Sequence, residues 1–181
     1  MRTRLFLVLP LLLMFSLTGC ASTSIDFSSI REIPDNEGVV FGRLAINYEG
    51  RDINQLTTIL GERAFHLFLL KEGSSVVIDA PLENDGYFFW HLPNGKHTIT
   101  NFSGLTPDIL SYHISGRIVS DFDVVPDQVS YIGTLFLLIK NSNYVTVVRD
   151  ENNDATRYFN LLYPGMKKPI SSSLMKLEKK Q

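Results

Sequence analysis

The 181-residue chain contains one cysteine, Cys20, so it can form neither an intramolecular disulfide nor a zinc site built from several cysteines. It also lacks the Gly-x-Ser-x-Gly motif of serine hydrolases and the short histidine motifs of many metalloenzymes. Its one long apolar run, Leu5 to Leu17, is broken by Pro10 and is shorter than the roughly 20 residues that span a bilayer. These absences point away from a disulfide-stabilised module and from a protein that crosses the membrane with this run.

The N-terminal residues are arranged as a secretory signal. Arg2 and Arg4 precede the apolar run, and small residues follow it. The tetrapeptide Leu17-Thr18-Gly19-Cys20 resembles the lipobox of bacterial signal peptidase II substrates. That resemblance implies S-diacylglycerol modification of Cys20, then cleavage between Gly19 and Cys20, and then N-acyl (palmitate) modification of the new amino terminus. An ordinary secretory signal cleaved after Ala21 or Ser22, or a transmembrane helix, is the alternative.

Lipidation of Cys20 would attach the mature chain to the lipid bilayer, because two acyl chains anchor a protein stably where one does not. Residues 20–37 are rich in serine and lack periodicity, which predicts a flexible tether. Since Ala21 rather than aspartate follows the cysteine, the resemblance to enterobacterial lipoproteins implies the outer membrane, on its periplasmic side. An envelope protein or assembly is the expected partner there.

Charge is distributed unevenly along the chain. The formal net charge is −2, and five lysines lie within residues 166–181, so the domain before them is acidic. An acidic domain is a poor match for nucleic acid, whose phosphates are bound by lysine and arginine. The basic segment 166–181 predicts a disordered, solvated tail, and contact with anionic lipid is the alternative.

Residues 38–165 are predicted to form one mainly β domain. Short runs of β-branched, aromatic and aliphatic residues alternate with turn residues, which favours a seven- to eight-stranded antiparallel β-sandwich over an α+β domain. Leu135 to Ile139 is apolar at every position and predicts a central strand covered on both faces. The predicted strands are 39–48, 64–71, 75–80, 87–92, 96–102, 114–125, 131–139 and 144–149.

Two short helices are also predicted. Asp52 begins a capping-box pattern for a surface helix that would end at Gly61. A second helix, over residues 153–163, has Asn153 as its N-cap and Pro164-Gly165 as its stop. Its apolar side chains recur at helical spacing and predict packing on the sandwich, with a partner or cofactor groove as the alternative. They are Ala155, Tyr158, Phe159 and Leu162.

Residues 86–99 carry the most distinctive pattern of the domain. Pro93-Asn94-Gly95 predicts a tight turn that joins the two flanking runs into a hairpin. The pattern resembles the signature hairpin of carboxypeptidase-regulatory-like and transthyretin-like β-sandwiches, on Gly86, Phe88, Trp90, Leu92, Pro93, Gly95 and Ile99. His97 stands where those domains have tyrosine. The resemblance implies a non-catalytic accessory, binding or structural module.

The first strand of this pattern also offers a candidate binding surface. Strand alternation turns Phe88, Trp90 and Leu92 to one face. The other face would present an apolar strip able to stack on a sugar or to take a partner protein, unless the C-terminal helix or a second sheet covers it. That strip consists of Tyr87, Phe89 and His91.

Possible metal ligands are scattered through the domain. The histidines are His66, His91, His97 and His113. Three acidic residues lie near one another in sequence, namely Asp121, Asp123 and Asp127. Neither set has the spacing of a zinc or EF-hand site, so we assign no metal, cofactor or catalytic residue.

Two hypotheses of different class follow from the sequence. The favoured one is a membrane-anchored, non-enzymatic envelope lipoprotein that acts as an accessory, structural or binding module. The alternative is an envelope metal-dependent enzyme or a carbohydrate-binding module that uses the histidines, the acidic residues or the aromatic strip.

Overall fold

The computed structural model describes residues 33, 35–53, 65–80, 82–83, 85–105 and 113–178. The predicted leader, Cys20 and nearly all of the predicted tether lie outside these residues. Most of the first predicted helix and the last three residues of the predicted tail lie outside them as well.

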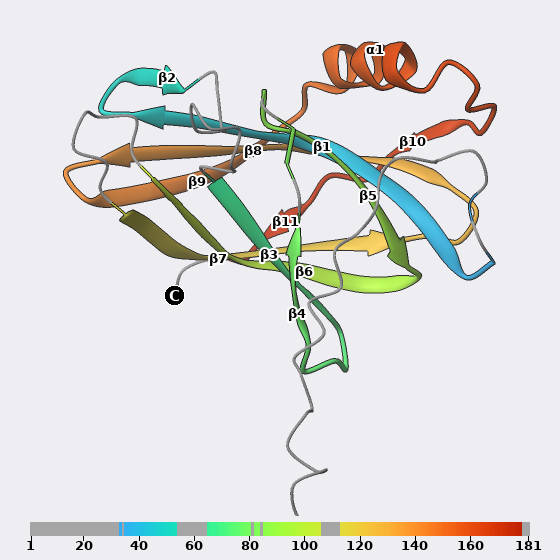
Figure 1. Ribbon diagram of the computed structural model, residues 1–181, viewed down its shortest axis with the longest axis horizontal. Helices are drawn as coiled ribbons and strands as arrows, with labels where there is room; N and C mark the ends of the chain where they lie inside the picture. The colour runs from blue at the N-terminus through green and yellow to red at the C-terminus, as the bar shows by residue number, and fades with distance from the viewer. Residues whose placement is uncertain are drawn as a thin grey trace, which may run out of the picture.

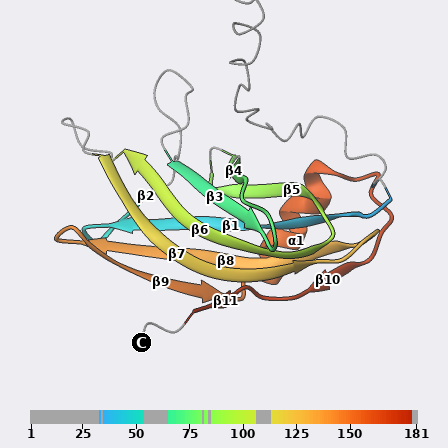
Figure 2. The ribbon, with the colours of Figure 1, turned by 90° about the horizontal axis from the view of Figure 1, so that it is seen from below.

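The described chain folds as a β-sandwich with one short helix on its outside, which confirms the predicted fold class (Figures 1 and 2). One sheet has six strands: β1 (Glu37–Tyr48), β2 (Arg51–Ile53), β5 (Tyr87–Pro93), β8 (Val129–Lys140), β9 (Asn143–Arg149) and β10 (Ile170–Ser172). The other sheet has five, in the order β11 (Lys176–Leu177), β7 (His113–Val124), β6 (Gly95–Leu105), β3 (Phe65–Lys71) and β4 (Val77–Ala80). The helix is α1 (Asn152–Leu162).

The six-stranded sheet is organised around β1 and β8, which pair in parallel along most of their length. All other pairs except β10 with β8 are antiparallel, so the sandwich is antiparallel-rich rather than purely antiparallel. The register between β1 and β8 shifts after Phe41, where β8 carries an extra residue at Ile132-Gly133. Gly133 has a φ of 104°, a backbone conformation that favours glycine, so the sequence can bulge there without strain.

The main core lies between the two sheets. Alternate residues of each strand point into it, and the predicted inward set of β5 is confirmed, because Phe88, Trp90 and Leu92 are all buried. Phe88 and Trp90 stack at a ring-centroid distance of 3.9 Å. Apolar burial of this extent is the dominant stabilising term of such a domain.

A second, smaller core lies on the outer face of the six-stranded sheet, beneath α1. The helix lays Ala155 and Phe159 onto that face, and both are buried. Phe159 stacks on Phe41 of β1 at 4.7 Å. The predicted helix packing is confirmed, except that Leu162 remains 43% exposed.

The helix starts differently from the prediction. It begins at Asn152, and Glu151 rather than Asn153 is its N-cap. The backbone N–H of Glu151 donates to the Tyr131 hydroxyl at 2.7 Å, and the Thr134 hydroxyl donates to the Glu151 carboxylate at 2.8 Å. These two hydrogen bonds attach the start of the helix to β8.

The helix covers only part of that outer face. Leu135, Leu137 and Ile139 of β8 point into the main core, but Phe136 is only half-buried and Leu138 is 38% exposed. The prediction that this stretch is covered on both faces is therefore wrong. The part of β8 that is covered on both faces is its beginning, at Val129 to Tyr131.

The predicted hairpin at Pro93-Asn94-Gly95 is also wrong. The turn is present, but β5 pairs with β1 in one sheet while β6 pairs with β3 and β7 in the other. The chain therefore crosses from sheet to sheet at this turn. The backbone N–H of Asn94 donates to the carbonyl of Asn36, which ties the crossing to the start of β1.

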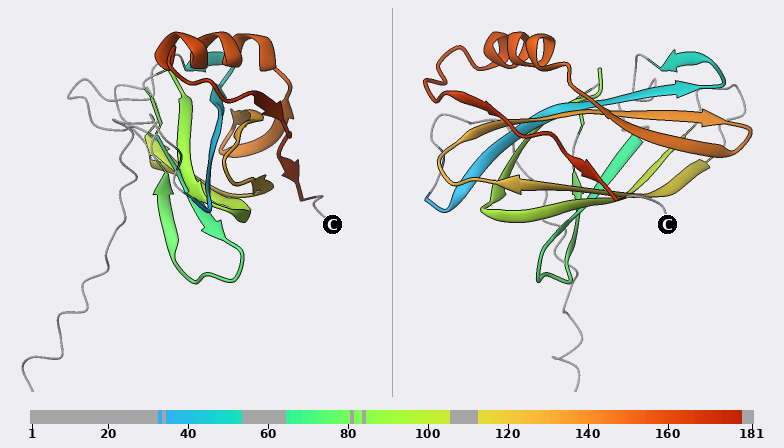
Figure 3. Two further views of the ribbon diagram at one scale, coloured as in Figure 1. Left: turned by 90° about the vertical axis from the view of Figure 1, so that its right-hand side faces the viewer. Right: turned by 180° about the vertical axis from the view of Figure 1, so that it is seen from behind.

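The C-terminal segment is folded as far as it is described, contrary to the disordered tail that its composition predicts. Residues 170–172 form β10 beside β8, and residues 176–177 form β11 beside β7 (Figure 3). Between them Met175 is buried in the main core and donates its N–H to the carbonyl of Ile132. The segment thus closes one side of the sandwich by joining both sheets.

Asp52, predicted to cap a helix, lies instead in β2. Glu49 and Gly50 both have positive φ, at 50° and 82°, which makes the tight turn of a β1–β2 hairpin. The Asn47 side chain donates to the Asp52 carboxylate across this hairpin at 2.8 Å. Among the described residues, no helix combines the length and the hydropathy needed to cross a membrane.

Candidate functional site on the outer face of the five-stranded sheet

The aromatic strip predicted on β5 is covered by α1. Phe89 is 2% exposed, and the half-buried Tyr87 stacks on Tyr158 of the helix at 4.3 Å. Burial, together with a hydrogen bond to Asp85, raises the pKa of Tyr158 to about 12. His91 lies at the end of the strip, its Nε2 3.2 Å from the Glu37 carboxylate. The strip is therefore an interface between sheet and helix, and not an open binding surface.

The histidines do not converge. His97 is fully buried in the main core, whereas His91 lies on the outer face of the other sheet. The two are separated because the chain crosses between sheets at the intervening turn. His66 and His113 lie on the outer face of the five-stranded sheet, on β3 and β7.

His97 occupies the tyrosine position of the resembled hairpin, and from the core it makes a hydrogen bond to the turn. Its Nδ1 is 3.1 Å from the carbonyl of Gly95, so Nδ1 carries the hydrogen and donates. Its Nε2 has no hydrogen-bond partner, and neither does the hydroxyl of the buried Ser120. Burial lowers the pKa of His97, partly offset by the bond to Gly95, so the ring is neutral at pH 7.

The three aspartates do not form a carboxylate cluster either. Asp121 is bound by Lys96 at 2.8 Å and by the Thr98 hydroxyl at 2.7 Å. Burial raises the pKa of Asp121, but these two bonds outweigh it and lower the pKa overall. Asp127 pairs instead with Lys168 of the C-terminal segment. Within the described ranges, no three His, Cys, Asp or Glu side chains gather in a way that could hold a metal ion.

The outer face of the five-stranded sheet is not covered by α1, and it carries a row of mixed side chains. Leu67 and Leu69 of β3 are fully buried, so alternation turns Phe68 outward. In register with Phe68 lie Asp79 on β4 and Asn101 on β6. Such a row places one aromatic ring between polar neighbours on both sides.

A second row lies beside the first. His66 on β3 is in register with Ser103 on β6, which in turn is in register with Ser115 on β7. The Ser103 hydroxyl is 2.9 Å from Nε2 of the exposed His113. The imidazole Nδ1 of His66 is 3.1 Å from both oxygens of Asp79.

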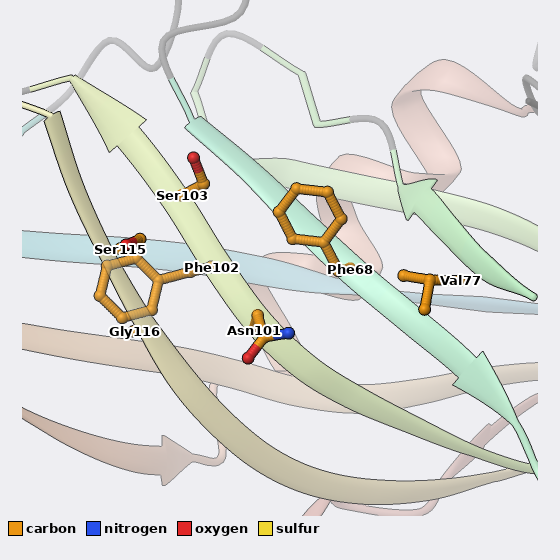
Figure 4. Close-up of a pocket in the computed structure, with 7 residues that line it drawn as sticks. All are labelled: Phe68, Val77, Asn101, Phe102, Ser103, Ser115 and Gly116. Atoms are coloured by element: carbon orange, nitrogen blue, oxygen red, sulfur yellow. The ribbon is translucent and has the colours of Figure 1, made fainter.

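These rows surround a depression of about 470 Å³ in the sheet surface (Figure 4). This volume lies within the range of about 300–1,000 Å³ that small-molecule sites occupy. Figure 4 shows Phe68 and Val77 at one side, with Asn101 and Ser103 beside them on β6. Its lining consists of Phe68, Val77, Asn101, Phe102, Ser103, Ser115 and Gly116.

One polar pair on this face is of the kind that serine hydrolases use. The Ser103–His113 pair brings a hydroxyl and an imidazole together, but no carboxylate of the described residues is hydrogen-bonded to His113. A serine nucleophile in the usual triad requires that third group to orient the histidine. The face does offer a flat ring, an amide and several hydroxyls in fixed positions on adjacent strands.

The sequence analysis did not select these residues. Phe68 is one apolar residue within an apolar run, and only its place between Leu67 and Leu69 shows that it points outward. Asn101 and Ser103 follow a register shift in β6 at Ile99 to Asn101, which reverses the alternation and is not visible in the sequence.

Comparison with known proteins does not identify a family. No protein-family model matches the chain. No curated protein matches it. Among solved structures, the crystal structure of a DUF3823 family protein from Parabacteroides merdae ATCC 43184 aligns with 60% of this chain and 51% of that chain, at 20% sequence identity and a TM-score of 0.31. The match thus spans about half the length of that protein. A TM-score this low carries no argument about fold or function.

Proposed function

We propose that this protein is a membrane-anchored envelope lipoprotein whose β-sandwich is a non-enzymatic binding module. The observation that carries the proposal is the tetrapeptide Leu17-Thr18-Gly19-Cys20, placed directly after a charged and apolar leader. Acylation of Cys20 would hold the sandwich beside a lipid surface. Ala21 after the cysteine favours the outer membrane over the inner one.

Two features of the sandwich support a binding role. The side of the six-stranded sheet that carries β5 packs against α1, so its aromatic residues serve the fold. Among the described residues, no helix packs on the outer face of the five-stranded sheet, which carries the depression around Phe68. The domain would therefore present this face to a partner or ligand in the envelope.

The anchor is tested by Cys20→Ser, with Ser22→Ala as the matched control just outside the lipobox. In a bacterial host, the unchanged protein and Ser22→Ala should incorporate radiolabelled palmitate and sediment with the outer membrane. Cys20→Ser should retain the leader and carry no label. Recovery of the unchanged protein from the aqueous fraction with an unmodified thiol at position 20 would contradict the proposal.

A further inference from the structure

We infer that the depression around Phe68 binds a saccharide, with one sugar ring lying on the phenyl ring and its hydroxyls bound by the neighbouring polar side chains. This inference rests on the proposed function, because it names the ligand class of the surface through which the tethered domain would act.

The first support is the flat aromatic surface. The rings of Phe68 and His66 are nearly parallel, with an interplanar angle of 17° and centroids 6.4 Å apart. Asp79 fixes the imidazole from the next strand. A pyranose ring presents a flat face of C–H groups, which packs on an aromatic ring, whereas a protruding peptide side chain needs a deep pocket.

The second support is the kind of polar group beside the phenyl ring. The Asn101 amide lies directly across the register from Phe68, and the hydroxyls of Ser103 and Ser115 lie in the next row. An amide and a hydroxyl each donate and accept hydrogen bonds. Sugar hydroxyls also do both, so these short side chains match them without a change of protonation.

The third support is the pairing of the charges around the depression. Asp79 is paired with His66, and Asp121 with Lys96 and Thr98. Among the described residues, these pairs leave no block of like charge beside the depression to select a strongly charged ligand. Arg117 lies across the register from Asn101, and its guanidinium could donate hydrogen bonds to sugar hydroxyls or to a single carboxylate.

Few of the described large apolar side chains are exposed on this face, which argues against a large protein interface here. Beyond Phe68, the large apolar side chains exposed on or beside it are Val76, at 55%, Val77, at 53%, and Leu105, at 38%. A stable protein interface buries about 1,200–2,000 Å² around an apolar centre. A small hydroxyl-rich ligand fits the depression better.

The test is calorimetric titration of the full chain, held in a polyoxyethylene ether detergent because maltoside detergents would themselves present sugars. The probes are di- to tetrasaccharides of glucose, galactose, mannose and N-acetylglucosamine, together with a glucuronic acid disaccharide. Phe68→Leu keeps an apolar side chain but removes the ring, and Phe68→Tyr keeps the ring. Phe136→Leu, a half-buried phenylalanine on the outer face of the other sheet, is the matched control.

We expect at least one probe to bind. Phe68→Leu should weaken that binding roughly tenfold, since an aromatic contact of this kind carries about that factor. Phe68→Tyr and Phe136→Leu should bind like the unchanged protein. Asn101→Ala, at an exposed position, should weaken binding without affecting folding, which keeps the test decisive if Phe68→Leu is unstable.

The inference is overturned if no probe binds, or if Phe68→Leu and Asn101→Ala bind as tightly as the unchanged protein. It is also overturned if cellular crosslinking shows a Phe68-dependent protein partner while no saccharide binds. These results differ from a failure of the proposed function. Palmitate on Cys20 without saccharide binding would contradict this inference but not the proposal of a membrane-anchored module. Saccharide binding by a chain without palmitate would contradict the proposed anchor but not this inference.

Discussion

Phe159→Ala tests whether α1 holds the outer aromatic layer in place. Phe159 is fully buried and packs against Phe41, Phe89 and Tyr163, at ring-centroid distances of 4.7, 5.9 and 5.1 Å. Truncation of a buried phenylalanine to alanine costs about 3–5 kcal/mol of unfolding free energy. Because Phe159 and Ala155 are the buried residues of the helix, we expect a loss of about 3 kcal/mol.

Urea unfolding measures this loss, with the fluorescence of Trp90 as the signal. Trp90 is the single tryptophan of the chain and is fully buried between the sheets, so its transition reports on the sandwich itself. The matched control is Leu161→Ala on the same helix, where the side chain is 74% exposed and the change should stay within about 0.5 kcal/mol.

A second measurement separates undocking of the helix from global destabilisation. If the helix leaves the sheet in Phe159→Ala, the strip of Tyr87 and Phe89 becomes exposed and a dye that binds apolar surface should fluoresce more strongly than with Leu161→Ala. A loss below about 1 kcal/mol together with unchanged dye binding would refute the reasoning, because it would mean that α1 does not cover the strip.

Two further predictions concern single buried sites. Burial lowers the pKa of His97 in the folded state, so the unfolded chain binds a proton first as the pH falls. The contribution of the neutral His97 to the unfolding free energy should be fully present above about pH 6.5. Below that pH the unfolding free energy should fall by up to about 1.4 kcal/mol for each pH unit until the folded pKa is reached. Urea unfolding between pH 7.5 and 5.5 should show this fall in the unchanged protein and a smaller one in His97→Phe, and equal slopes would contradict it. Gly133→Ala should cost about 1–3 kcal/mol, because φ is 104° there and the new Cβ would lie 2.9 Å from Val148 Cγ1. Gly165→Ala is its control, since a Cβ at that position would meet nothing within 4 Å, and an equal effect of both changes would refute the argument.

Local patterns were enough to predict the longer strands and the inward face of β5, but not the short strands β2, β10 and β11. Alternation is a property of the strand alone, so Phe88, Trp90 and Leu92 could be assigned to the core without knowing the partner strand. The pairing of strands could not be predicted in this way. A turn such as Pro93-Asn94-Gly95 reverses the chain whether the next strand joins the same sheet or the opposite one, and the choice depends on residues far away, such as Asn36.

The C-terminal segment shows a second limit. Serine and lysine dominate residues 166–181, and such a composition usually indicates a solvated tail. The buried Met175, the partly buried Met166, Ile170 and Leu177, and backbone bonds to β7 and β8 place it in the sandwich. The depression around Phe68 was missed for a related reason, because it is assembled from single residues on β3, β4, β6 and β7.

The parallel pairing of β1 with β8 has a consequence for the time at which the protein can fold. β1, the first of the described strands to leave the ribosome, has its longest neighbour, β8, about 90 residues further along the chain, and β10 and β11 follow β8 and fill the remaining side. Contacts between such distant parts of a chain form slowly. The polypeptide must therefore be released as far as residue 177 before the pairing of its described strands is complete.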